Sequence, residues 1–295
     1  MSFSSDIKKE LAQIEEKGCC AVAQAYGMAE FGHSFSKRAV SLQTENEAIA
    51  KRYATLISEV CGVKPYMSVG IGMYTVTMPA AEETLAVLER FGHSGEVTLR
   101  LNRANLDCDA CAAAFLRGVF LVCGAVTNPQ VDYHLEFSVP FLHMSNDLVA
   151  LLKEQGLNAK TVRRKGQYIV YFKESEQIED CLTLMGAMSA TLELMNVKLI
   201  KNIRNNVNRA ANCESANLDK TVAASLAQIE AIKKLQKHGV WDTLPEELRQ
   251  LCRLRTENPE YSLRELGAAL EPPLSRSGVN HRLQRITKLA EEWEG

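Results

Sequence analysis

An apolar stretch in the middle of the chain, Cys111–Asn128, restricts how this sequence can fold more than any other feature. A helix that is apolar on every side has to be buried, and Gly124 ends the helical part of the stretch. Ala114, Gly118 and Ala125 lie four and seven residues apart, so they share one side of the helix. An ordinary core helix could carry the same small residues. Their alignment nevertheless predicts the close approach of a second helix.

A second stretch rich in small residues, Cys19–Phe35, is the candidate partner, and the same order of elements follows each stretch. That order is an extended segment, a helix, two strands and a further helix. The expected ranges are Arg38–Thr44, Glu45–Cys61, Lys64–Met78 and Ala81–Phe91 after the first stretch, and Val131–Val139, Ser145–Gln155, Leu157–Lys173 and Ser175–Gly186 after the second. A repeat of roughly ninety residues indicates a duplicated α/β unit.

Three segments of the chain carry a resemblance to known families. The segment Phe115–Gly124 is similar to the LAGLIDADG helix of homing endonucleases, in which two such helices pack at a pseudo-twofold axis and two saddle-shaped sheets straddle DNA. Over nearly all its length the chain resembles the WhiA family of bacterial regulators, most specifically at Phe115–Asn128, Asn205–Lys220 and Ser262–Ile286. The resemblance implies an α+β fold, in which a duplicated LAGLIDADG-type αββαββα saddle domain precedes an all-α helix-turn-helix domain.

The resemblance and the composition together predict four parts of the chain. Residues 1–105 are the first, divergent LAGLIDADG-like half, and residues 106–195 are the second half. Residues 196–218 form a basic, asparagine-rich connector, and Met195, Leu199 and Ile203 supply an apolar stripe at its start. Residues 219–295 form the helix-turn-helix domain. Asparagine suits caps and turns more than a helix interior, so a basic helix that leads into this connector is the expected domain boundary.

Residues 219–295 have the pattern of a compact helical domain. Helical spacing of apolar residues predicts a first helix that ends near Gly239 and a second at Glu246–Arg255. Ser262 and Glu265 form a capping box at the start of a short third helix. The expected buried stripes are Val222, Leu226, Ile229 and Ile232 on the first helix and Val279, Leu283, Ile286, Ala290 and Trp293 on the last.

The last helix has the composition of a helix that reads DNA. No acid occurs between Leu274 and Ala290, so positive charge is concentrated on the front of the helix. A basic amphipathic helix is more often a solvated face, but a short capped helix, a turn and an acid-free helix form the layout of a helix-turn-helix. The family's Ser-Gly-Val-Asn-His-Arg stretch, present here as Ser277–Arg282, favours DNA recognition.

The expected DNA-binding residues divide into base readers and phosphate contacts. Asn280 and Arg282 can make paired hydrogen bonds to adenine and guanine, so base reading is assigned to them. Lysine and arginine elsewhere neutralise phosphates and release counterions. The full expected set is Arg264, Ser275, Arg276, Ser277, Asn280, His281, Arg282, Gln284, Arg285 and Lys288, with Lys198, Lys201 and Arg204 on the connector. Arg163, Arg164 and Lys165 fit either a solvated turn or a phosphate contact, and the fold of the endonucleases slightly favours the contact.

The acids that a LAGLIDADG nuclease needs do not stand at their expected positions. In that family each central helix ends in an acid that holds magnesium beside the scissile phosphate. Counting along the motif places Gly32 and Cys123 there, and neither suits magnesium. Glu30 lies half a turn away and is a poor substitute for two acids at the twofold axis. We therefore expect a scaffold that no longer cuts, is not an enzyme, and carries no metal or cofactor.

The cysteines indicate reduced thiols. There are nine of them, an odd number, and many lie in apolar helices, which fits a reducing compartment better than a disulfide framework. Cys108 and Cys111 form a CxxC motif without a second ligand pair. Since a zinc site needs four ligands, a structural helix entry is favoured over a metal site.

These observations lead to the hypothesis of a non-catalytic, sequence-specific DNA-binding protein. The net charge of −2 argues against a uniformly basic nucleic-acid binder, so charge would have to be local. The resemblance implies a transcriptional regulator in cell division, chromosome segregation or sporulation, with double-stranded DNA as partner and another transcription factor or an RNA polymerase component as a candidate protein partner. The alternatives are a residual endonuclease that uses Glu30 and a scaffold whose saddle binds a protein.

The location and the oligomeric state are also expected from the sequence. The chain shows no signal peptide and no apolar run of membrane-spanning length, so we expect a cytoplasmic, nucleoid-associated protein without membrane attachment. Because the two small-residue helices would satisfy each other within one chain, we expect a monomer.

Overall fold

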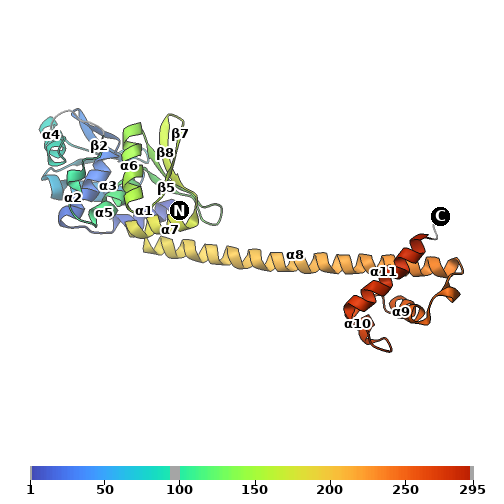
Figure 1. The fold of residues 1–295 in the computed structure, drawn as a ribbon. Helices are drawn as coiled ribbons and strands as arrows, with labels where there is room; N and C mark the ends of the chain where they lie inside the picture. The colour runs from blue at the N-terminus through green and yellow to red at the C-terminus, as the bar shows by residue number, and fades with distance from the viewer. Residues whose placement is uncertain (1, 94–99, 293–295) are drawn as a thin grey trace. The chain divides into compact units, whose positions relative to one another are not determined.

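The computed structural model describes residues 2–93 and 100–292, and the chain forms two compact units, Met1–Lys201 and Asn202–Gly295 (Figure 1). The first unit combines helices with two four-stranded sheets, and the elements of the second are all helical. The predicted α+β class is therefore confirmed. Among the helices of the described residues, none is both long and apolar enough to cross a membrane.

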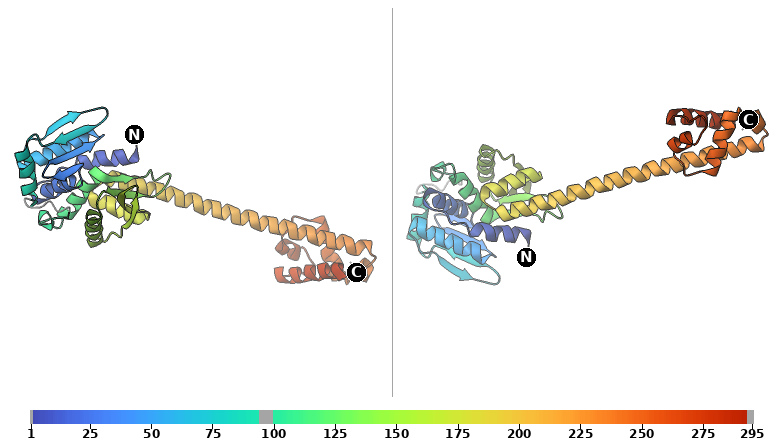
Figure 2. Two further views of the ribbon diagram at one scale, coloured as in Figure 1. Left: turned by 90° about the horizontal axis from the view of Figure 1, so that it is seen from above. Right: turned by 90° about the horizontal axis from the view of Figure 1, so that it is seen from below.

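The N-terminal unit contains the same arrangement of elements twice (Figure 2). After α1 (Phe3–Ala12), the first copy consists of α2 (Gly18–Glu30), β1 (Ser34–Ser36), β2 (Ala39–Thr44), α3 (Glu47–Cys61), β3 (Tyr66–Val69), β4 (Tyr74–Thr77) and α4 (Ala81–Arg90). The second consists of α5 (Cys111–Cys123), β5 (Gly124–Val126), β6 (Leu135–Val139), α6 (Leu142–Glu154), β7 (Lys160–Arg164), β8 (Gln167–Phe172) and α7 (Ser175–Met185). The strand orders, β1-β2-β4-β3 and β5-β6-β8-β7, match position by position and every pairing is antiparallel, which confirms the predicted duplication.

Each sheet has one face on the core and one face open, as alternation along its strands requires. In β6, Leu135, Phe137 and Val139 are fully buried, and the residues between them are only partly covered. All five residues of β7 are exposed. The hairpin between β7 and β8 turns at Lys165 and Gly166, both with positive φ, as a two-residue hairpin turn demands.

Helices α2 and α5 pack with their backbones in contact at two glycines. A Cβ atom on Gly118 would lie 2.4 Å from the carbonyl oxygen of Gln24, and one on Gly27 would lie 2.6 Å from that of Phe115. The predicted close approach along Ala114 and Gly118 is thus confirmed, with Gly27 as its counterpart on the partner helix. Ala125 was wrongly placed in this seam, because the helix ends at Cys123 and Ala125 pairs with Glu136 in the sheet.

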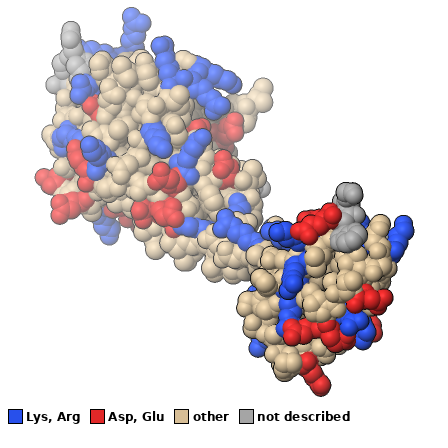
Figure 3. Space-filling view, turned by 45° about the vertical axis from the view of Figure 1, so that its right-hand side comes forward, with Lys and Arg blue, Asp and Glu red and all other residues tan. Residues whose placement is uncertain are grey.

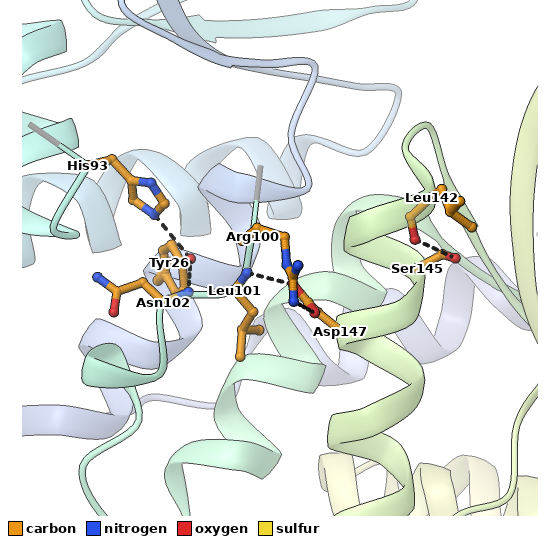
Figure 4. Close-up of polar contacts among 8 residues, drawn as sticks. All are labelled: Tyr26, His93, Arg100, Leu101, Asn102, Leu142, Ser145 and Asp147. Atoms are coloured by element: carbon orange, nitrogen blue, oxygen red, sulfur yellow. Dashed lines mark hydrogen bonds and ion pairs between the residues drawn. The ribbon is translucent and has the colours of Figure 1, made fainter. Parts of the chain in front are cut away.

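The segment between the two copies is attached to both of them (Figure 4). The backbone N–H of Asn102 donates a 2.8 Å hydrogen bond to the hydroxyl of Tyr26 in α2, and that hydroxyl lies 3.2 Å from Nε2 of His93. Arg100 forms a bidentate ion pair with Asp147 of α6 at 2.7 and 2.9 Å, and the N–H of Leu101 donates to the same carboxylate. The chain that leads into α5 is therefore fixed before the central helix begins.

The basic helix expected at the start of the connector continues through its asparagine-rich part, where caps and turns were expected. A single helix, α8, runs from Met188 to Lys237, and the division between the two compact units falls inside it. The preference of asparagine for caps and turns is a fraction of a kcal/mol per residue, so it does not break a helix whose other residues favour it. The apolar stripe of Met195, Leu199 and Ile203 is exposed.

The C-terminal unit packs the end of α8 with three further helices, α9 (Glu246–Glu257), α10 (Leu263–Ala268) and α11 (Arg276–Glu292), and a 3-10 turn, Trp241–Thr243. Val279, Leu283, Ile286 and Ala290 form the buried stripe of α11, as predicted, while Trp293 lies outside the described residues. On α8 the expected stripe is only partly correct. Ile232 is buried, whereas Val222 and Leu226 are exposed, because the core covers only the end of the helix.

Candidate nucleic-acid interface

Local capping fixes both helices of the predicted helix-turn-helix. Ser262 accepts a 3.3 Å hydrogen bond from the N–H of Glu265, and the Glu265 carboxylate accepts one of 2.7 Å from the N–H of Ser262, which is the predicted capping box. At α11 the hydroxyl of Ser275 accepts a 3.2 Å hydrogen bond from the N–H of Gly278. Ser275 is therefore a cap of the helix, in addition to its predicted place among the DNA contacts.

A tight turn brings α10 and α11 together. The N–H of Leu274 donates a 2.9 Å hydrogen bond to the carbonyl of Gly267, and a Cβ atom on Gly267 would lie 2.2 Å from the carbonyl oxygen of Leu274. Ahead of α10, the buried Arg255 donates a 2.7 Å hydrogen bond to the carbonyl of Tyr261. The start of α10 is thus attached to α9. Gly267 allows the turn between α10 and α11 to pack closely on α10.

The front of α11 is polar and open to solvent. Opposite its buried stripe lie seven exposed members of the predicted set: Arg276, Ser277, Asn280, His281, Gln284, Arg285 and Lys288. Arg264, on α10, is exposed as well. Of the seventeen residues of α11 only four are buried, so packing explains few of the side-chain choices along this helix. The arrangement can present hydrogen-bond donors and acceptors to a groove of DNA.

Arg282 differs from the other predicted base reader. Its guanidinium forms a 2.6 Å ion pair with the Glu247 carboxylate of α9, and its side chain is only 27% exposed. This contact ties α11 to α9 and uses part of the donor fork that base reading would need. The geometry therefore favours a positioning role for Arg282 and leaves Asn280 as the exposed candidate reader.

A hollow of about 590 Å³ lies beside the front of α11. It is bounded by α8, α10 and α11 and includes three predicted residues, Arg264, Arg276 and Asn280. Two further polar side chains from α8, Asn217 and Lys220, line it as well and were not among the predicted contacts. Their sequence segment, Asn205–Lys220, had been singled out by the resemblance, but only the fold brings it beside α11.

Two of the three connector cations have partners within the N-terminal unit. Lys198 forms ion pairs with Glu176 at 2.6 Å and Glu179 at 3.2 Å, both on α7. Lys201 donates a 2.7 Å hydrogen bond to the carbonyl of Pro129 and lies 4.9 Å from the centre of the Tyr133 ring. These contacts attach the start of α8 to its unit and count against phosphate binding by either lysine. Arg204 is exposed.

The basic hairpin of the second sheet is also exposed. Arg163, Arg164 and Lys165 are open to solvent, and the Arg163 guanidinium lies 5.7 Å from the centre of the Tyr168 ring. On the face drawn in Figure 3, basic and acidic side chains are interspersed on both units. The charge pattern on that face does not decide between a solvated turn and a phosphate contact for this hairpin.

The resemblance places the two catalytic acids of a nuclease at Gly32 and Cys123, and neither residue supplies a carboxylate. A Cβ atom on Gly32 would lie 2.8 Å from the carbonyl oxygen of Ser41, so no acidic side chain fits there without a backbone shift. Cys123 donates a hydrogen bond to the carbonyl of Val119, and burial raises the pKa of its thiol to about 12. Lys8 interacts electrostatically with this thiol and would add a positive charge where a nuclease binds its metal.

Glu30 does not replace the missing acids. The side chain is 3% exposed, and neither carboxylate oxygen has a hydrogen-bond partner among the described residues. Burial raises the pKa of this carboxyl to about 8, so the group is mostly neutral at pH 7. The negative charge of Asp147 raises the pKa of this carboxyl further. A neutral carboxyl is a poor ligand for magnesium.

The expectation that the CxxC motif has no second pair of cysteine ligands was wrong. Cys19 and Cys20, at the start of α2, lie beside Cys108 and Cys111, and the four sulfur atoms are all within 4.8 Å of one another. The second ligand pair is far away in the sequence, so spacing within the CxxC segment could not find it.

Comparisons with known proteins agree with this architecture. The family models described as "WhiA LAGLIDADG-like domain" and "WhiA C-terminal HTH domain" match residues 112–204 and 207–290. The chain is 36% identical over 314 residues to a "Probable cell division protein WhiA" of Alkaliphilus metalliredigens, with 100% of this chain and 99% of the relative covered. It is 40% identical over 313 residues to the protein of that name from Clostridium acetobutylicum, with 99% and 98% covered. The crystal structure of full-length DUF199/WhiA from Thermatoga maritima matches with a TM-score of 0.60 and 25% identity over 99% of both chains.

Proposed function

The chain belongs to the WhiA family, and we propose that it is a sequence-specific DNA-binding regulator of transcription that does not cut DNA. The observation that carries the proposal is the exposed, acid-free front of α11 behind the capped helix α10. Packing does not require these polar side chains, whereas DNA recognition uses side chains of these types.

In this proposal the N-terminal part of α11 enters the major groove, as the second helix of a helix-turn-helix does. Asn280 reads a base edge, since its amide can donate to and accept from adenine at once. Arg264, Arg276 and Lys220 surround the hollow next to Asn280 and contact phosphates, which gives register without reading sequence. Arg282 holds the helix in place through Glu247.

The names of the relatives support a proposal for the process that this regulator controls. They are named as cell division proteins, so we propose that the genes under control serve cell division, with chromosome segregation and sporulation as related roles that the family implies. A regulator of this kind acts where the chromosome is, in the cytoplasm at the nucleoid. A second transcription factor or a component of RNA polymerase is its proposed protein partner.

The N-terminal unit serves, in the same proposal, as a LAGLIDADG-type scaffold without nuclease activity. Gly32 has no room for an acid, Cys123 has a thiol with a raised pKa, and Glu30 is a buried acid with a raised pKa. Because α2 and α5 pack on each other within one chain, as two protomers would at a symmetric interface, we propose a monomer.

Selection of bound fragments from random duplex DNA with the full-length protein tests the proposal. Wild type should enrich one sequence motif, and Asn280→Ala should enrich none or a degenerate one. Arg253→Ala, an exposed change on α9, is the control and should enrich the wild-type motif. The selected site is then incubated with protein and magnesium or manganese, and it should remain intact.

Enrichment of no motif by wild type would contradict sequence-specific binding and favour the alternative of a scaffold for a protein partner. Cleavage of the selected site that disappears in Glu30→Gln would contradict the non-catalytic part of the proposal alone. Sequence-specific binding and the absence of cleavage are therefore tested by separate outcomes.

A further inference from the structure

Four cysteines from two distant segments meet at one end of the central helix pair. Cys19 and Cys20 lie in the first turn of α2, Cys111 is the first residue of α5, and Cys108 precedes it. The Cys108 sulfur lies 3.5 Å from that of Cys19, 3.6 Å from that of Cys20 and 3.5 Å from that of Cys111. Residues 89 positions apart in the chain are thus brought into contact through their thiols.

These separations match the geometry of one shared cation. With a Zn–S bond of about 2.3 Å, the edges of a sulfur tetrahedron are about 3.8 Å long. The sulfur atoms of a disulfide lie about 2.05 Å apart, well below any of the three distances above. Four sulfurs within 4.8 Å of one another therefore have the spacing of ligands around a single ion.

The backbone around the cysteines favours negative charge. Helix α2 begins after Lys17 and α5 after Ala110, and neither residue caps its helix with a side chain. Neither helix has an acid in its first turn. The positive ends of both helix dipoles therefore lie beside the sulfurs, which favours negative charge on sulfurs that bind a metal.

The segment that supplies Cys108 is held in place independently of the thiols. Arg100 and Leu101 bind Asp147, and Asn102 binds Tyr26 (Figure 4). Arg103 forms an ion pair with Glu154 at 2.8 Å. A prearranged ligand loses less conformational freedom when the metal binds. The site is thus built from two anchored segments.

We propose that Cys19, Cys20, Cys108 and Cys111 bind one thiophilic divalent cation of the zinc class. Four protein ligands complete a tetrahedral shell and leave no position for substrate, so the ion is structural and not catalytic. It joins the first turns of α2 and α5 and thereby clamps the helix pair at the end away from Gly32 and Cys123. Four thiolates select zinc over magnesium, so this site does not restore the nuclease.

The experiment is metal analysis of the full-length protein, purified with a thiol reductant and without chelator. We expect one equivalent of zinc per chain by elemental analysis. Replacement by Co²⁺ under anaerobic conditions should give the intense visible bands of tetrahedral cobalt and thiolate-to-cobalt charge transfer in the near ultraviolet. Removal of the metal with a strong chelator should lower the Tm, because binding free energy adds to folding free energy.

Variants show which sulfurs bind the ion. Cys108→Ser, at an exposed position, should reduce the bound zinc to near zero after gel filtration, and Cys213→Ser, an exposed cysteine on α8, should keep the full equivalent. If Cys108→Ser does not fold, the cobalt spectrum of the wild type still shows whether thiolates bind the ion.

Two results would overturn the proposal. One is a wild-type protein whose reduced thiols give no charge-transfer band with Co²⁺ and hold no zinc. The other is a disulfide among the four cysteines in the freshly purified protein, found by mass mapping, with no metal uptake after reduction. Neither result bears on DNA selection by α11, so the failure of this proposal is distinguishable from that of the proposed function.

Discussion

Two helices of the chain, α5 and α11, meet different requirements. In α5, ten of thirteen residues are buried, and its one charge, Arg117, donates to the carbonyl of Met185 and pairs with Glu16 within the unit. In α11, only four of seventeen residues are buried, and its front consists of exposed polar and basic side chains. The residues of α5 are explained by packing, whereas packing leaves most of those of α11 unexplained.

The difference separates residues that packing requires from residues that a reaction would require. The close helix pair depends on glycines at Gly27 and Gly118, which packing alone maintains. The catalytic acids of a nuclease depend on the reaction, and under the proposed function Gly32 and Cys123 occupy their positions. Exposed side chains that packing does not require are therefore the candidates for function in this chain.

The largest expected effect comes from a substitution in the packed region, at the contact between α2 and α5. Gly118→Leu places a side chain where the carbonyl oxygen of Gln24 lies within 2.4 Å of a Cβ atom, so α2 and α5 must separate. We expect a loss of about 3 kcal/mol or more in the free energy of unfolding, or no folded protein, measured by urea denaturation. Lys153→Leu, exposed on α6, is the control. A stable, normally folded Gly118→Leu protein would show that the helix pairing is wrong.

A second prediction concerns the buried acid of the packed region. Because burial raises the pKa of Glu30 to about 8, the folded protein keeps this carboxyl protonated where the unfolded chain, with a pKa near 4.5, ionises it. Stability is thus full below about pH 4.5 and falls as the pH rises toward 8, by roughly 2 kcal/mol between pH 5 and pH 7. Glu30→Gln should flatten this slope in urea titrations at several pH values.

Exposed Glu193→Gln is the matched control for that series and should retain the wild-type slope. If Glu30→Gln kept the slope as well, Glu30 would not be the buried neutral acid that the structure indicates. Addition of magnesium should leave the unfolding curve of wild type unchanged.

A smaller effect separates the lysines of α8 from the cations of the helix-turn-helix. Lys198→Ala removes ion pairs to Glu176 and Glu179, and we expect it to cost about 1 kcal/mol of stability or less and to leave the salt dependence of DNA binding unaltered. Arg276→Ala should do the reverse, with a salt slope lower by about 0.9 and unchanged stability. A lower salt slope for Lys198→Ala would instead restore the sequence-based expectation that this lysine contacts phosphate.

The sequence was sufficient for those features that depend on local pattern. Periodicity located the helices and the longer strands of both copies but missed the short first strands β1 and β5. The spacing of Ser262 and Glu265 predicted the cap of α10 correctly. The small-residue side of α5 predicted a close partner helix, because only a neighbouring backbone fills the space over a glycine.

The sequence was insufficient wherever distant side chains meet. The ion pair of Arg282 with Glu247 and the meeting of Cys19 with Cys108 depend on how helices pack, and no spacing within one segment reveals them. The asparagines of α8 were misread for another reason, since a weak local preference was given more weight than the continuity of the helix around it.

The central claim, that α11 reads sequence, is tested most directly by one ratio. The affinity of the full-length protein for its selected site, divided by that for a scrambled duplex, is measured over a salt series for wild type, Asn280→Ala and Arg253→Ala. Asn280→Ala should lower the ratio by ~1–3 kcal/mol with little change in salt slope, and Arg253→Ala should leave the ratio unchanged. An unchanged ratio in Asn280→Ala would contradict the assignment of base reading to this residue, and equal wild-type affinity for both duplexes would contradict sequence reading by the chain altogether.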